Sequence, residues 1–75
     1  MEQRILDILA GVNDELLTYT GPNMVDDEII DSFELIALVS RLEDEFDIEI
    51  DAGDVTAENF GNKDCIIELI KKMVK

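Results

Sequence analysis

The chain has 75 residues, of which 47% are apolar, and its nineteen acidic and six basic residues give a net charge of −13 at pH 7. This charge repels nucleic acid and anionic lipid, so neither is an expected partner, whereas it attracts basic protein surfaces or divalent cations. There is no His, and Cys65 is the single cysteine, which excludes an internal disulfide, the common zinc sites, and Cys–His or Ser–His–Asp catalytic groups.

The first predicted element is an amphipathic helix over residues 2–17. Its apolar residues recur at helical spacing and fall on one narrow stripe. The stripe consists of Ile5, Leu9, Val12 and Leu16.

A long loop follows, because the periodicity stops from residue 18 to residue 30. Gly21-Pro22-Asn23 is a turn signal within it. A loop of this length in so small a domain is usually functional or mobile. Four of its apolar residues are expected to hold it to the core: Met24, Val25, Ile29 and Ile30.

The second helix is predicted to begin at Asp31 and to run to about Asp47. Asp31 is a favoured N-cap residue, and Glu34 stands three positions later, as in a capping box. Residues 48–50 alternate but are too few for a sheet, and residues 51–54 form a turn signal.

The C-terminal part is predicted to contain one short helical turn over residues 55–60 and a last helix over residues 63–74, capped by Asn62. The buried stripe of that helix is Ile66, Ile70, Met73 and Val74, and its final turn carries Lys71, Lys72 and Lys75. We therefore expect an all-α fold in one domain, residues 1–75. It is a small bundle of three main helices plus a short extra helix, with a long loop between the first and second helices.

The middle helix has two apolar faces on a helical wheel. The core face consists of Leu35, Leu38, Val39, Leu42 and Phe46. The opposite face consists of Phe33, Ile36, Ala37, Ser40 and Asp44, with Glu43 and Asp47 on its flank. Apolar residues ringed by acids suit a partner with an apolar centre and a basic rim. The wheel leaves open whether Phe33 is exposed or folds under the loop.

Ser32 lies just inside the start of this helix. The first backbone N–H groups of a helix are free and the dipole is positive there, so a phosphate ester on the Ser32 hydroxyl would be tolerated. Position alone is weak evidence, because serine is common at helix starts for structural reasons.

The residues around Ser32 carry a family resemblance. The run Ile30-Asp31-Ser32-Phe33-Glu34, followed by Leu42-Glu43-Asp44-Glu45-Phe46 and then Ile48-Glu49-Ile50, resembles the acyl and peptidyl carrier proteins. The resemblance implies that a phosphopantetheinyl transferase attaches 4′-phosphopantetheine to Ser32, with Asp31 part of the same motif. It also implies partner contacts through the acidic residues Glu34, Glu43 and Asp44 and the apolar residues Phe33 and Ile36. Ala37 and Ser40 lie on the same face of the wheel and are expected to contact partners as well.

The function that follows is that of a free-standing, monomeric carrier in the cytoplasm, without enzymatic activity of its own. It would hold acyl or aminoacyl groups as thioesters, receive them from a ligase, and deliver them to biosynthetic enzymes with basic docking patches. Three residues depart from the commoner family pattern and leave the cargo open, including the fatty acyl, aminoacyl and polyketide-like classes. These are Ile29, Phe33 and Ala37.

Two alternatives remain at this point. One is an unmodified acidic helical module that binds a basic protein. The other is a calcium loop over residues 47–58, which is disfavoured because Ala52 stands where that loop requires glycine. We expect no dedicated metal site and, at most, weak binding of Ca²⁺ or Mg²⁺ by the acidic segments.

Overall fold

The structure is a computed structural model that describes residues 2–74. Its elements are α1 (Glu2–Val12), the 3-10 turn η1 (Asp14–Leu17), α2 (Ser32–Phe46), the 3-10 turn η2 (Ala52–Asp54), α3 (Ala57–Phe60) and α4 (Lys63–Met73). There is no strand among the described residues. The predicted all-α bundle of three main helices and one short extra helix is therefore confirmed.

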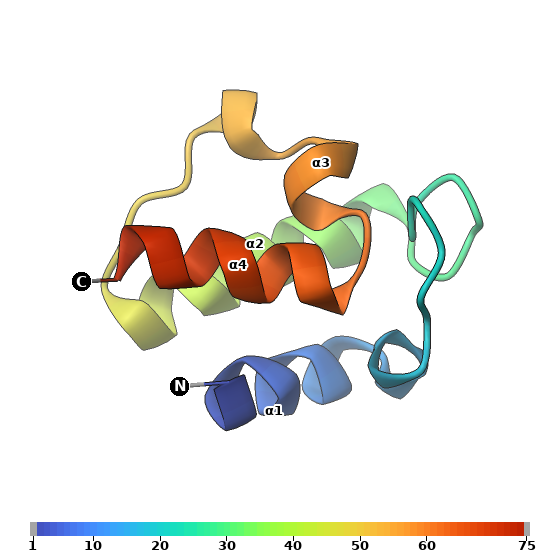
Figure 1. Cartoon of the computed structure of the whole chain (residues 1–75), viewed down its shortest axis with the longest axis horizontal. Helices are drawn as coiled ribbons and strands as arrows, with labels where there is room; N and C mark the ends of the chain where they lie inside the picture. The colour runs from blue at the N-terminus through green and yellow to red at the C-terminus, as the bar shows by residue number, and fades with distance from the viewer. Residues whose placement is uncertain (1, 75) are drawn as a thin grey trace.

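The three long helices lie along one direction of the molecule. Figure 1 shows that α1 runs opposite to α2 and α4, and that the long loop crosses one end of the bundle to join α1 to α2. α4 packs against both α1 and α3. Within residues 2–74, no helix has the length and apolar character needed to cross a membrane.

The first helix is shorter than predicted. It ends at Val12, and residues 14–17 form the separate turn η1. The break occurs at Asn13, whose backbone is extended (φ −164°, ψ 114°) and whose side chain accepts a hydrogen bond from the Glu15 backbone N–H. An asparagine side chain that bonds to nearby backbone competes with the helical hydrogen bonds, and this ends α1 although the apolar spacing continues to Leu16.

One cluster of buried side chains draws on every helix. Its fully buried members are Ile5, Leu9, Leu16, Met24, Leu38, Leu42, Ile66 and Ile70. Ile30 from the loop and Phe60 from α3 are also buried against it, each 3% exposed. The predicted role of the loop residues is confirmed, since Met24 and Ile30 lie in the core and Val25 and Ile29 pack on its edge.

α2 has defined ends, and both are set by acidic residues. At its start, Asp31 and Glu34 form the predicted capping box. At its end, Asp47 adopts a left-handed backbone conformation (φ 53°) and donates its N–H to the Glu43 carbonyl. Aspartate tolerates this conformation better than most residues, so it ends the helix without a glycine.

Candidate functional site

Ser32 is the first residue of α2, and its side chain is exposed. Its neighbours satisfy the start of the helix. The Asp31 side chain accepts from the Glu34 N–H at 2.8 Å, and the Glu34 carboxylate accepts from the Asp31 N–H at 3.3 Å. Because these two residues supply the cap, the Ser32 hydroxyl is available for reaction.

An open pocket of about 470 Å³ lies beside Ser32. Its apolar wall comes from the loop, and three carboxylates stand around it. The lining residues are Val25, Glu28, Ile29, Ile30, Asp31, Ser32 and Glu34. A phosphate ester fits this site sterically, because the hydroxyl faces solvent at a helix N-terminus, where the dipole offsets part of the repulsion from the carboxylates.

The exposed face of α2 begins one residue after Ser32. Phe33 is 83% exposed and Ile36 is 63% exposed, which makes them the two exposed large apolar residues of the described chain. Phe33 is therefore not folded under the loop, which decides the alternative that the helical wheel left open. Ala37, Ser40 and Asp44 are also exposed on this helix. We call Phe33, Ile36, Ala37, Ser40 and Asp44 the α2 strip.

A shallow groove of about 300 Å³ runs along one side of the α2 strip. It lies between α2 and the segment that follows it. Ile36, Val39 and Ser40 form one side, and Ile50, Ala52 and Val55 are on the other. This groove extends the apolar surface beyond the two exposed side chains.

Glu43 has a structural contact that the sequence did not reveal. It is half-buried, and its carboxylate accepts a hydrogen bond from the Ile50 N–H at 2.8 Å. This bond fastens the chain after α2 back against the helix, and both of its residues line the groove. Among the predicted contact residues, Glu43 is thus the one with an additional role in holding the exit from α2.

The loop before Ser32 contains a polar cluster that was also not predicted. The Tyr19 hydroxyl donates to the Asp27 carboxylate and accepts from the Asn23 N–H at 2.9 Å. Partial desolvation and the hydrogen bond to Asp27 raise the pKa of Tyr19 above its ordinary value. The shift favours the protonated phenol, which is the form that donates to Asp27.

Residues 2–74 contain no group of three or more His, Cys, Asp or Glu side chains placed to hold a metal ion. The carboxylates of residues 47–58 in particular do not converge on one point. The acidic residues near α2 are spread along its surface instead, where they produce a negative field around the α2 strip.

The capping box gives a stability prediction. Replacing Asp31 with alanine is expected to lower the free energy of unfolding by about 1 kcal/mol, because the Glu34 N–H loses its acceptor. Asp31→Asn keeps an acceptor oxygen and should stay within about 0.5 kcal/mol of the wild type. Urea unfolding followed by circular dichroism measures both, and an equal loss in the two variants would show that the charge of Asp31, rather than its capping oxygen, matters.

A comparison with known proteins identifies a relative of this chain. An acyl carrier protein from Syntrophobacter fumaroxidans is 37% identical over 75 residues, covering 96% of this chain and 89% of that protein. No family model matches the chain, and no solved structure gives a significant match. The likeness extends over nearly the whole of both chains and is not confined to the segment around Ser32.

Proposed function

The chain belongs to the acyl carrier protein family, and from this we propose that it carries acyl groups on a 4′-phosphopantetheine arm attached to Ser32. Carrier proteins are not enzymes. When bound, the arm supplies a flexible tether with a terminal thiol that holds the cargo as a thioester. The observation that carries the proposal is an exposed serine at the start of α2 whose neighbours make the cap.

The attachment step places definite demands on Ser32. Its Oγ attacks the phosphorus of coenzyme A that bears the pantetheine. An O–P bond forms, the phosphoanhydride bond breaks, and adenosine 3′,5′-bisphosphate leaves. The transferase would take the hydroxyl proton, because the chain has no histidine and the carboxylates that flank Ser32 in the helix start, those of Asp31 and Glu34, are engaged in the cap. Ser32 thus provides the nucleophilic oxygen, which the fold places at the start of α2.

We assign the remaining features of the site to partner recognition. The α2 strip would contact the transferase, the ligase that loads the arm, and the enzymes that use the cargo. The net charge of −13 would steer basic patches of these partners towards it. Such docking is brief, since a carrier must leave each enzyme. We also propose that residues 1–75 act as one carrier domain, because one core joins all the helices.

The direct test is the mass of the intact protein. After incubation with coenzyme A and a broad-specificity phosphopantetheinyl transferase, the chain is expected to gain the mass of one phosphopantetheinyl group, and peptide mapping should place the group on Ser32. Absence of any gain, under conditions that modify a known carrier protein, would overturn the proposal. It would favour an unmodified acidic module that uses the same α2 strip to bind a basic protein.

The α2 strip gives a second prediction. Ile36→Ala should lower kcat/KM for modification by about tenfold, because the lost apolar contact is worth about 1.4 kcal/mol or more when a partner buries it. Steady-state kinetics at fixed transferase and several carrier concentrations measure this effect. The free energy of unfolding should change by less than about 0.5 kcal/mol, since Ile36 is mostly exposed.

Charge-matched variants separate the local contact from the overall field. Asp44→Asn removes one exposed charge from the α2 strip, and Glu68→Gln removes one from α4. Asp44→Asn should slow modification more than Glu68→Gln, and the difference should shrink as salt is added. Equal effects of the two variants would mean that the transferase responds only to the net charge of the carrier and that α2 is not the contact face.

A further inference from the structure

Two asparagines hold the loop that leads to Ser32, and each performs two tasks at once. The first, Asn13, lies between α1 and η1. Its Oδ1 accepts from the Glu15 N–H at 3.0 Å, and its Nδ2 donates to the Ile29 carbonyl at 2.9 Å. The same side chain therefore starts η1 and fastens the backbone three residues before Ser32.

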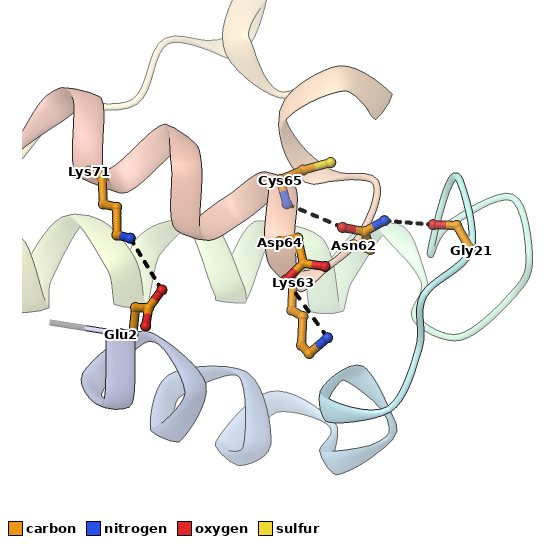
Figure 2. Close-up of polar contacts among 7 residues, drawn as sticks. All are labelled: Glu2, Gly21, Asn62, Lys63, Asp64, Cys65 and Lys71. Carbon is orange, nitrogen blue, oxygen red and sulfur yellow. Dashed lines mark hydrogen bonds and ion pairs between the residues drawn. The ribbon is translucent and has the colours of Figure 1, made fainter.

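The second asparagine, Asn62, has the same pair of contacts at the start of α4 (Figure 2). Its Oδ1 accepts from the Cys65 N–H at 3.2 Å and caps the helix, while its Nδ2 donates to the Gly21 carbonyl at 2.9 Å. Gly21 lies 41 positions earlier in the chain. Asn62 thus ties the first half of the loop to the corner between α3 and α4.

The loop lies close against this corner. The Met24 N–H donates to the Gly61 carbonyl at 2.9 Å. A Cβ atom at Gly61 would clash with the Pro22 carbonyl oxygen of the loop and with the Ala57 carbonyl oxygen of α3, so a side chain there would force the loop and α3 apart. The contact of Asn62 is therefore part of a tight backbone-to-backbone approach.

The two asparagine contacts are joined through Met24, whose side chain is fully buried. Its carbonyl accepts from the Ile29 N–H at 2.9 Å and from the Ile30 N–H at 3.3 Å. Asn62 therefore holds the loop at Gly21, and Gly61 beside it holds the loop at Met24. Met24 in turn fixes Ile29 and Ile30, and Asn13 holds Ile29 from the other side. Ser32 follows two residues after this fixed segment.

We propose that Asn13 and Asn62 are positioning residues for the modification of Ser32. The inference rests on the proposed function. Because the loop is already ordered, Ser32 is held in one position before a transferase binds the start of α2. If the loop were loosened, binding would have to order it, and the cost would appear in the KM of the carrier.

Aspartate substitutions separate the two tasks of each side chain. Asn13→Asp and Asn62→Asp keep the capping oxygen but replace the donor with a carboxylate that faces a carbonyl. Each is expected to raise the KM for modification by about threefold to tenfold, the range that corresponds to loss of one hydrogen bond, with kcat nearly unchanged. Amide hydrogen exchange should accelerate in residues 18–31 and not in α4.

Asn59→Asp is the matched control. Asn59 donates from Nδ2 to the Asp54 carbonyl at the same 2.9 Å, but outside the long loop, so this variant has the same added charge and the same kind of lost bond. Its KM should stay at the wild-type value. Asn13→Ser and Asn62→Ser supply a second test, because serine keeps a capping oxygen and adds no charge; the same rise in KM is expected.

The outcomes are distinct. A wild-type chain that is not modified at all overturns the proposed function, and the positioning role with it. If the wild type is modified but the Asn13 and Asn62 variants have the same KM as the wild type, the positioning role alone is overturned. The same follows if Asn59→Asp raises the KM as much as these variants do. A fall in kcat without a change in KM or in loop exchange also overturns it, because it would place the effect in the chemical step.

Discussion

Ser32→Ala is expected to abolish phosphopantetheine attachment completely, while the fold remains intact. The substitution removes the oxygen that forms the ester, and no neighbouring group takes its place. The hydroxyl is exposed, and Asp31 and Glu34 make the helix cap. The free energy of unfolding should therefore change by less than about 0.5 kcal/mol, as for most surface substitutions.

The control for this experiment is the other serine of the chain. Ser40 lies on the same helix and is also exposed. Because it belongs to the α2 strip, only the end point of the reaction is compared, and there Ser40→Ala should show the full mass of the prosthetic group. A Cys65→Ser background gives an independent measure, because the chain then has no thiol until the arm is attached. A mass gain in Ser32→Ala would show that another residue is the attachment point.

Local signals were sufficient to predict α2 from the sequence. The capping box depends on two residues three positions apart, so its geometry is set within one helical turn. The same holds for Asn62 as the cap of α4. The core face of α2 was also predictable, because helical periodicity places Leu38 and Leu42 on the same side, and both are fully buried.

Contacts between distant parts of the chain could not be predicted in this way. The end of α1 depends on Asn13. Its side chain is bonded to the Ile29 carbonyl, sixteen residues away, and this bond helps to keep Asn13 out of the helix. The exposure of Phe33 depends on the path of the loop, which the wheel does not describe. The bond between Glu43 and Ile50 likewise requires the turn at Asp47 to bring the exit of α2 back.

The hydrogen bonds of the acidic residues explain how a small, highly charged chain keeps both a core and an acidic surface. The carboxylates repel one another, so the acidic surface adds little to stability. Several are used locally instead: Asp31 and Glu34 in the cap, Asp27 on Tyr19, and Glu43 on Ile50. The negative charge of the surface is thus tolerated in part because several of the carboxylates also hold backbone and loop in place.

The core face of α2 gives the prediction with the largest effect on stability. Leu42→Ala is expected to lower the free energy of unfolding by about 2–5 kcal/mol, because it leaves a cavity at a fully buried position. A domain of this size has a total stability of about 4–11 kcal/mol, so the variant would lose a large part of it. Urea unfolding of the wild type and the variant measures the difference.

Ile36→Ala is the matched comparison, since it removes a side chain of similar size from the opposite face of the same helix. It should leave unfolding nearly unchanged and weaken modification, whereas Leu42→Ala should destabilise the chain and leave the kcat/KM of the folded fraction close to wild type. Measured below its unfolding transition, the Leu42 variant still presents Ser32 and the α2 strip. If both variants lost stability to the same extent, the α2 strip would have to be part of the core, and the assignment of a docking face to α2 would be wrong.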